Sequence, residues 1–264
     1  MSLSGKTLKN SYIDLLQMDN SNGGVGGSLR RIKDGSGDST AMMMASDAVR
    51  IIPPSTDNTS VFQVRGQTGT DLFTVDSTNA SVTALTNIVN TQYATFSVDN
   101  ATASSFVDDT HHPIPFSNAN YGALTSGHIP VFGTSTDPAT TFTTADANGT
   151  RASDLVPVMW YVPDAMSIDS INSIEGADNA TGDTTRMHLF SYTFTSGATL
   201  CLTSGTLLAH NSDVTNAGSE QPYLTTWTVD SAAVTAGKVI LAFFKSDSIN
   251  SDYSINITVK YHLT

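Results

Sequence analysis

The chain has 264 residues, a net charge of -12 and a pI near 4.6, and only 14% of its residues are charged. This acidity argues against binding to a nucleic-acid backbone, which needs clustered Lys and Arg to displace counterions. Runs of strong helix formers are scarce, whereas β-branched and turn-forming residues are common, so the composition predicts a mainly β protein. The length allows one large β domain or two smaller parts.

The cysteine content and the apolar runs indicate in which cellular compartment the protein is made. Cys201 is the single cysteine, so a disulfide framework is excluded, and its apolar-alternating surroundings predict a buried small side chain. Residues 1–10 are polar, and no apolar segment of a signal peptide follows them. The longest apolar runs, such as residues 239–244, are too short to span a bilayer. We therefore expect a soluble protein that is made in a cytosol and does not insert into membranes.

Residues 1–60 predict an N-terminal arm. Scattered large apolar residues suit either an extended segment or one short helix at 8–17, and the glycine-rich stretch 19–27 predicts a loop. Segments 29–33 and 41–45 are strand-like and flank a turn. Because this portion is rich in glycine and poor in large side chains, we expect it to fold on a partner or within an oligomer and to serve as an anchor.

The only basic cluster of the sequence lies in the same arm. Its members are Lys6, Lys9, Arg30, Arg31 and Lys33. The cluster predicts either contact with a negatively charged docking partner or a solvated face.

Residues 61–112 predict a stalk built on a repeated motif. The motif occurs as Phe62-Gln63-Val64-Arg65, Phe73-Thr74-Val75-Asp76 and Phe96-Ser97-Val98-Asp99. Each copy is typical of one short strand in which the aromatic residue and the valine share one face. Strands so short and so far apart cannot build a core within one chain, so we expect identical chains to bury these faces around an axis. An irregular surface segment is the alternative interpretation.

The stretch between the second and third copies predicts a short helix. Val82, Leu85, Ile88 and Val89 recur at spacings of three and four, which suits an amphipathic helix or one turn of trimeric coil. The side chains expected at the trimer axis are Phe62, Val64, Phe73, Val75, Leu85, Ile88, Phe96 and Val98.

Residues 113–264 predict a β-sandwich head. Pro113 and Pro115 mark its start, because neither can donate to a strand ladder. Evenly spaced strands are expected at residues 156–162, 166–175, 185–194, 198–203, 223–229, 238–245 and 253–262. The last alternates cleanly, with Ile255, Ile257 and Val259 on one face. Residues 239–244 are expected to form a fully buried strand.

No motif for catalysis is present. The sequence contains neither a Gly-x-Ser-x-Gly elbow nor a His-Glu-x-x-His pair. His111 and His112 could place one imidazole per chain at a threefold axis, but packing or exposure is the favoured interpretation. Asp108, Asp109, Asp178 and Asp183 lack the twelve-residue spacing of a calcium loop. We therefore expect a protein without a cofactor or a metal site that is not an enzyme.

Aromatic side chains among polar residues are the better sign of ligand recognition, because a flat ring can stack on the apolar face of a sugar. Trp160, Tyr161 and Trp227 fall within predicted strands, so one ring of each strand is expected in the core. The candidate ligand-binding residues are Tyr121, Tyr223 and Trp227.

Several segments resemble the tail-fibre and head-fibre proteins of tailed phages, in particular marine ones. They are residues 8–22 (LKNSYIDLLQMDNSN), Asp34-Gly35-Ser36-Gly37, the Phe-x-Val copies, residues 90–96 (NTQYATF) and residues 110–116 (THHPIPF). The resemblance covers roughly residues 1–116. The end of the chain is similar in architecture to the jelly-roll heads that cap such fibres.

The resemblance implies a homotrimeric virion appendage. Its N-terminus would bind phage capsid or tail proteins, and its head would bind a host-surface glycan or receptor, with three sites adding avidity. A capsid-decorating cement protein and a fibre-borne glycan hydrolase are the alternatives. The hydrolase is disfavoured because it usually needs a long parallel β-helix with a groove, and the chain lacks such a repeat array.

Overall fold

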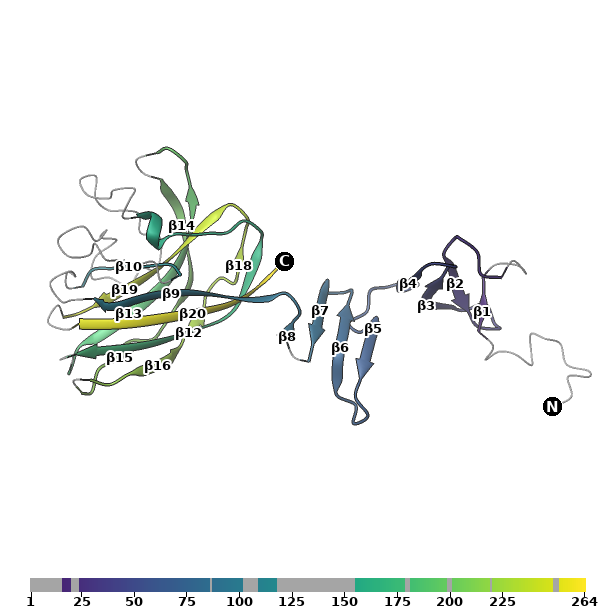
Figure 1. Cartoon of the computed structure of the whole chain (residues 1–264), viewed down its shortest axis with the longest axis horizontal. Coiled ribbons are helices and arrows are strands. Elements are labelled where there is room, and N and C mark those ends of the chain that lie inside the picture. The colour runs from purple at the N-terminus through teal and green to yellow at the C-terminus, as the bar shows by residue number, and fades with distance from the viewer. Residues whose placement is uncertain are drawn as a thin grey trace, which may run out of the picture. The chain divides into compact units, whose positions relative to one another are not determined.

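The structure is a computed structural model, and it describes residues 16–19, 24–85, 87–101, 109–117, 155–178, 181–198, 201–218, 220–248 and 252–264 (Figure 1). The chain divides into two compact units, residues 1–89 and 90–264. All strand pairings are antiparallel, and the one named helical element in the described residues is the 3-10 segment η2 (Val156–Val158). The prediction of a mainly β protein is confirmed.

The N-terminal unit contains two four-stranded sheets in which sequence neighbours are also spatial neighbours. The first sheet runs in the order β1 (Gln17–Met18), β2 (Arg30–Lys33), β3 (Ser39–Met44) and β4 (Val49–Ile51). The second runs in the order β5 (Phe62–Arg65), β6 (Asp71–Asp76), β7 (Ser81–Ala84) and β8 (Asn87–Ile88). Two of the Phe-x-Val copies therefore form strands, β5 and part of β6, as predicted.

The helix or coil expected over residues 82–89 is wrong. β7 and β8 occupy this stretch, and Leu85 turns the chain between them with a φ of 55°. Val82, Thr83 and Ile88 are β-branched, and such side chains pack well on a pleated sheet but lose rotamer freedom in a helix. The helix expected at residues 8–17 falls mostly outside the described residues, and Gln17 belongs to β1.

The C-terminal unit contains two larger sheets. One has the order β10 (His112–Ile114), β19 (Lys238–Ser246), β13 (Thr184–Phe194), β14 (Leu202–His210) and β17 (Thr228–Val229), with β11 (Trp160–Tyr161) on β19 and β15 (Val214–Thr215) on β13. The other has the order β16 (Tyr223–Thr226), β12 (Met166–Asp178), β20 (Asp252–Leu263) and β9 (Thr91–Ala101), with β18 (Ala233–Val234) on β12. We refer to them as the seven-stranded and the five-stranded sheet.

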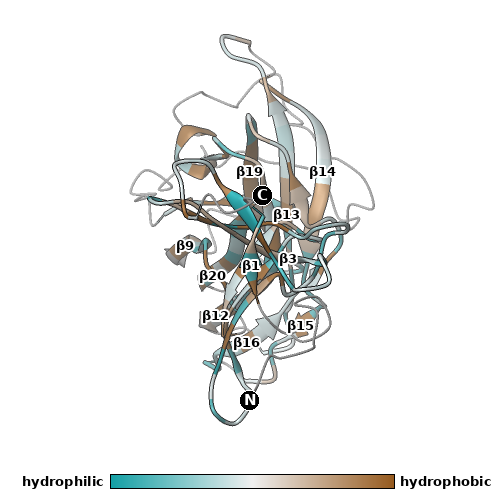
Figure 2. Ribbon diagram, turned by 90° about the vertical axis from the view of Figure 1, so that its right-hand side faces the viewer, coloured by the Kyte–Doolittle hydropathy of each residue, from teal (hydrophilic) through white to brown (hydrophobic). Residues whose placement is uncertain are grey.

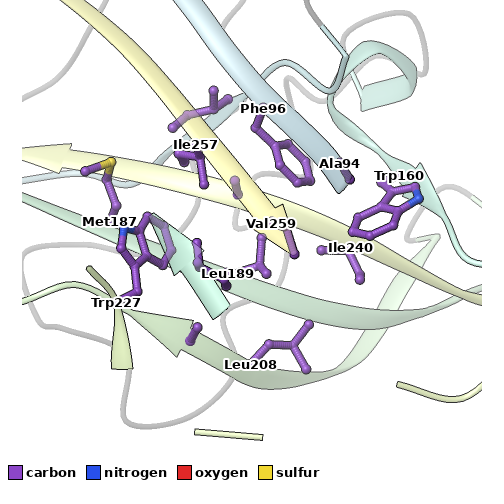
Figure 3. Close-up of a cluster of buried hydrophobic side chains, with 14 of the residues drawn as sticks. Ala94, Phe96, Trp160, Met187, Leu189, Leu208, Trp227, Ile240, Ile257 and Val259 are labelled. Carbon is purple, nitrogen blue, oxygen red and sulfur yellow. The ribbon is translucent and has the colours of Figure 1, made fainter. Parts of the chain in front are cut away.

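Side chains from both sheets form one core, which makes the unit a β-sandwich (Figure 3). Ile257 and Val259 of β20 point into it from the five-stranded sheet, and Met187 and Leu189 of β13 from the seven-stranded sheet. All four are fully buried, and each such side chain contributes roughly 1.5–3 kcal/mol relative to an exposed position. The alternation predicted for residues 253–262 is thus confirmed.

A second apolar cluster covers the opposite face of the seven-stranded sheet. Phe190 and Tyr192 of β13 and Leu241 and Phe243 of β19 pack there with Leu155 and Val158, and the partly buried Cys201 lies at its margin. Because both faces are covered, β19 is buried at six consecutive positions, 239–244, as predicted. Figure 2 colours the ribbon by hydropathy, and β19 contains the apolar run at these positions.

The predicted boundary between stalk and head lies at residue 113, whereas the two compact units of the structure meet between Val89 and Asn90. β9 pairs with β20 along most of its length and belongs to the C-terminal unit, which begins at Asn90. Pro113 lies inside β10, at the outer edge of the seven-stranded sheet, where a missing N–H is tolerated. Of the strands predicted later in the chain, 156–162 is split into η2 and β11, and the one expected at 198–203 begins only at Leu202.

Candidate functional site

The β5–β8 sheet has one apolar face. Directly opposed residues of an antiparallel pair share a face, and Phe62 opposes Val75, Val64 opposes Phe73, and Val75 opposes Val82. Phe73 also opposes Ala84. The apolar face of the β5–β8 sheet is defined by six residues: Phe62, Val64, Phe73, Val75, Val82 and Ala84.

Polar residues occupy the other face of this sheet. Gln63 opposes Thr74, and Thr74 opposes Thr83. The Gln63 side-chain amide donates to the Thr74 hydroxyl at 3.4 Å. The sheet is therefore amphipathic, as expected for a sheet with one solvated face and one covered face.

Local contacts hold the hairpins of this sheet. The Arg65 guanidinium lies 2.7 Å from an Asp71 carboxylate oxygen across the β5–β6 turn, an exposed pair worth at most about 1 kcal/mol. Asp76 accepts hydrogen bonds from the Asn79 side chain at 2.7 Å and from its backbone N–H at 2.9 Å, which lowers the pKa of Asp76. These contacts shape the turns but leave the apolar face uncovered.

The N-terminal unit has almost no buried core of its own. Among its described residues, Ala45 is the one buried hydrophobic side chain. Phe62 and Val64 of the apolar face are each 44% exposed. Small sheets need a packed hydrophobic face to be stable, so this unit requires a cover.

The β1–β4 sheet repeats this arrangement. Met42 opposes Ile51 and Met44 opposes Val49 on one face, and Val49 is 63% exposed. In the part of the unit that the structure describes, both sheets thus carry large apolar side chains that stay partly exposed.

The basic cluster predicted in the arm is divided by the strand geometry. Arg31 opposes Met43, whereas Arg30 opposes Met44 on the other face. Arg31 donates to the carbonyls of Thr40 and Ile52. Lys33 lies 3.0 Å from the carboxylate of Asp19. Of the described members, two are therefore engaged within the unit, and Lys6 and Lys9 lie outside the described residues.

The structure separates the eight predicted trimer-axis residues into groups. Phe62, Val64, Phe73 and Val75 share the apolar face of the β5–β8 sheet. Leu85 lies at the β7–β8 turn and is 61% exposed. Ile88 opposes Thr83 and so lies on the polar face.

Phe96 and Val98 do not fit the axis prediction, because they lie in the sandwich. Phe96 is fully buried, and its ring packs edge-on against Phe116 and Trp160 at centroid distances of 5.3 and 6.3 Å. Val98 packs against the same core. The third motif copy buries its apolar face within its own chain, because its sheet packs against the seven-stranded sheet of the head.

The predicted ligand-binding aromatics also divide. Trp227 is buried, and its indole N–H donates to the Ser173 hydroxyl at 2.9 Å, so it is a core residue. Tyr223 is partly exposed, and its hydroxyl bonds the Ala217 N–H and the Gln221 side chain. Tyr121 lies outside the described residues.

Two other tyrosines of the head are far more exposed. Tyr93 is 65% exposed and Tyr161 is 58% exposed, whereas Trp160 beside it is buried at 7%. The expectation of one core ring in the Trp160-Tyr161 pair is confirmed. The exposure of Tyr93 follows from strand alternation, since Ala94 points into the core.

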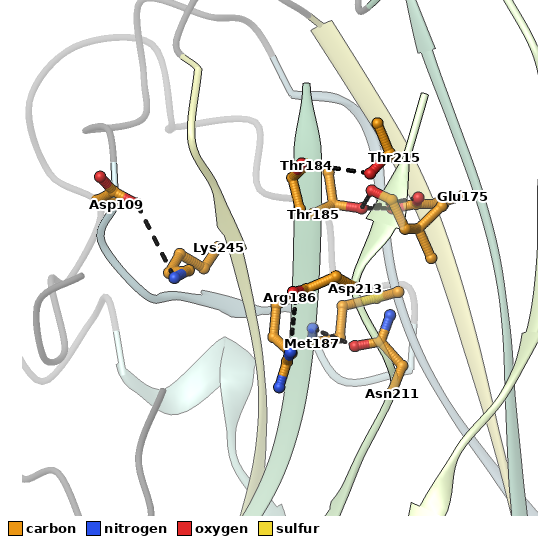
Figure 4. A network of polar contacts seen from close by, with 11 residues as sticks. Asp109, Glu175, Thr184, Thr185, Arg186, Met187, Asn211, Asp213, Thr215 and Lys245 are labelled. Atoms are coloured by element: carbon orange, nitrogen blue, oxygen red, sulfur yellow. Dashed lines mark hydrogen bonds and ion pairs between the residues drawn. The ribbon is translucent and has the colours of Figure 1, made fainter. Parts of the chain in front are cut away.

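A network of polar contacts lies around the start of β13 (Figure 4). Arg186 pairs with Asp213, which lowers the pKa of that carboxyl. Lys245 lies 3.9 Å from Asp109. Glu175, which the sequence reasoning missed, is 2% exposed and bonds Thr185. Its signal in the sequence is a glutamate at an inward position of an alternating strand.

The histidines expected near a threefold axis are inside the head. His111 and His188 have ring centroids 5.0 Å apart. Burial, followed by the nearby positive charges, lowers the pKa of His111 to about 3 and that of His188 to about 2, so both are neutral. His112 is likewise buried. In the part of the chain that the structure describes, no group of three or more ligating side chains could hold a metal ion.

Comparisons with known proteins do not identify the chain. No family model matches the chain, and no curated protein matches it either. Within the described ranges, no helix has the length and apolar character needed to cross a membrane.

Proposed function

We propose that the protein is a homotrimeric, non-enzymatic fibre of a tailed-phage virion. Its N-terminal portion binds capsid or tail proteins of the particle, the β5–β8 sheet belongs to the stalk, and the C-terminal sandwich is the head that attaches to the host surface. The phage role rests on the sequence resemblance of residues 1–116. The architecture rests on the structure of the two units.

The observation that carries the proposal is the apolar face of the β5–β8 sheet. Two Phe and three Val side chains share this face, and Ala45 is the one buried hydrophobic side chain among the described residues of the N-terminal unit. Burying a large apolar side chain contributes roughly 1.5–3 kcal/mol. A small sheet that leaves several such side chains unburied needs a further surface packed on them in order to be stable.

Copies of the same chain supply that cover. A cover required for folding must be present wherever the chain is made, and identical chains always are. A face with apolar side chains at its centre can also pack on the same face of another copy, as contacts between identical subunits require. The exposed apolar face supports association with other copies of the chain. The resemblance to phage fibres supports three copies as their number.

The charge distribution also supports the N-terminal unit as the region where copies of the chain associate. Residues 1–89 contain seven Lys and Arg against eight Asp and Glu, whereas residues 90–264 contain five against sixteen. Like charges on neighbouring copies repel. The nearly neutral N-terminal unit therefore associates at a lower electrostatic cost than the acidic head.

The strand order of the head supports a jelly roll. Its eight main strands occupy two sheets in the orders β16-β12-β20-β9 and β10-β19-β13-β14. Following the chain through these eight strands, every connection crosses between the sheets except that of the β13–β14 pair. Two sheets joined in this way are the arrangement of a double Greek key.

Exposed tyrosine rings support an attachment role for the head. Tyr93 and Tyr161 present flat rings to solvent, and such rings can pack on the apolar face of a sugar while the hydroxyl stays hydrated. Three heads on one fibre raise the avidity of weak individual sites.

The proposal is tested by light scattering on matched variants. Phe73→Asp places a charge on the apolar face, and Thr74→Asp places the same charge on the polar face of the same strand. We expect the Phe73→Asp protein to have the mass of one chain, 27.9 kDa, and the Thr74→Asp protein to remain trimeric. Equal masses for the two variants would contradict the proposed stalk.

The virion role has its own test. Mass spectrometry of purified particles of the phage that encodes the chain should detect it as a structural component. Its absence from intact particles would overturn the phage-fibre assignment while leaving the trimer untouched.

A further inference from the structure

Glu175 occupies an unusual position between the two sheets of the head. It lies on β12 of the five-stranded sheet and faces inward, as do Ile171 and Ser173 before it and Ala177 after it. Its carboxyl bonds Thr185 on β13, which belongs to the seven-stranded sheet (Figure 4). The contact therefore joins the two layers of the sandwich through side chains.

The hydrogen bonds around Glu175 are few for an ionised carboxylate. The Thr185 hydroxyl oxygen lies 2.8 Å from both carboxyl oxygens and 3.4 Å from the carbonyl oxygen of Val214. An ionised carboxylate accepts up to about four hydrogen bonds, but this hydroxyl has a single hydrogen to give. A protonated Glu175 supplies the second hydrogen itself, and the Thr185 hydroxyl can then donate onward.

Among the residues that the structure describes, no cation is a cause of the Glu175 pKa shift. In the described residues of the packed strands, the titratable side chains on the same side are three tyrosines. Tyr223 of β16 lies directly opposite Glu175, and Tyr253 and Tyr261 belong to β20. Asp183, just before β13, accepts a hydrogen bond from Tyr253. Arg186 follows the inward-facing Thr185 and so points to the other face of β13, where it pairs with Asp213.

We propose that Glu175 is a pH-sensitive latch, which holds the two sheets of the head together when it is protonated and loosens this end of the sandwich when it ionises. Burial is the main cause of a raised pKa for this carboxyl, about 7 in place of 4.5, and the Thr185 hydrogen bond opposes the shift. The latch therefore changes state near neutral pH.

The direction of the effect follows from proton binding. Between pH 4.5 and 7 the folded head keeps the Glu175 proton while the unfolded chain releases it, so stability falls as pH rises through this window. Above about pH 7 both states are ionised and the loss is complete. From pH 5 to pH 8 this group alone raises the unfolding constant of the head roughly 70-fold.

The test uses the full chain and tryptophan fluorescence. Both tryptophans, Trp160 and Trp227, are buried in the head, so their emission reports on its unfolding in urea. Glu175→Gln keeps the shape and removes the titration. Glu220→Gln is the matched control, since Glu220 is the only other glutamate and is exposed.

Between pH 5 and pH 8 the unfolding constant of the wild type should rise by a certain factor. We expect this factor to be roughly 70-fold smaller in Glu175→Gln and unchanged in Glu220→Gln. Thr185→Val provides a second readout, because removing the donor should move the loss to higher pH. The same pH dependence in the wild type and Glu175→Gln would overturn the latch. If Glu175→Gln fails to fold, an unmoved transition in Thr185→Val would overturn it instead.

Discussion

Replacing the phenylalanine of the Phe-x-Val motif by alanine should affect the stability of the head differently in the second and in the third copy. Phe73 and Phe96 are equivalent in the Phe-x-Val repeat, but Phe96 is fully buried in the sandwich core and Phe73 lies on the apolar face of the β5–β8 sheet. Removing a buried Phe side chain costs about 3–5 kcal/mol. The edge-on contacts of Phe96 with Phe116 and Trp160 place the expected loss for Phe96→Ala near 4 kcal/mol. Phe73→Ala should change the stability of the head by less than about 0.5 kcal/mol.

Urea unfolding followed by tryptophan fluorescence measures this difference, because both tryptophans lie in the head. With a denaturant slope of about 2 kcal/mol per molar, Phe96→Ala should lower the urea midpoint by about 2 M. Phe73→Ala should leave the midpoint in place and weaken association of the chains. Equal midpoint shifts for the two variants would refute the assignment of the third motif copy to the head.

Two further predictions concern the interior of the head. Trp227→Phe removes the donor to the Ser173 hydroxyl and should cost about 1–3 kcal/mol, measured with Trp160 as the remaining probe; an unchanged midpoint would contradict the buried hydrogen bond. His111 and His188 have lowered pKa values in the fold, so the unfolded chain takes up protons first and the head should lose stability as pH falls below about 6.5. In a Glu175→Gln background, which removes the opposing titration, adding His188→Gln should make the midpoint less sensitive between pH 6.5 and pH 4.5; an identical acid slope would show that His188 is not held neutral.

Strand alternation predicted much of the head. The runs that became β12, β13, β19 and β20 are long and contain clear apolar positions, so period and propensity agree there. The continuous burial of residues 239–244 was also readable, because a strand covered on both faces shows no alternation.

The sequence could not distinguish pairing within a chain from pairing between chains. Phe62, Phe73 and Phe96 occupy equivalent positions of one motif, yet only Phe96 has a partner strand far along the chain that completes a sheet. Such long-range pairing leaves no mark in a short segment. The helix expected over residues 82–89 was wrong for a related reason, because spacings of three and four can arise by chance in a short strand–turn–strand segment.

Polar interior positions were the least predictable part of the candidate site. Glu175 has no motif, and its properties come from burial and from a single hydroxyl on the opposite sheet. Trp227 was considered for ligand binding because polar residues surround it in sequence, but its indole N–H donates to the hydroxyl of Ser173, 54 positions away. Both depend on contacts that only the packed sandwich creates.

The central claim is that copies of this chain cover the apolar faces of its N-terminal unit. The most direct test is the mass of the unmodified protein in solution, measured by light scattering across a range of concentrations. We predict a particle of three chains, each of 27.9 kDa, that persists on dilution. A monodisperse single chain with its N-terminal sheets folded would contradict it.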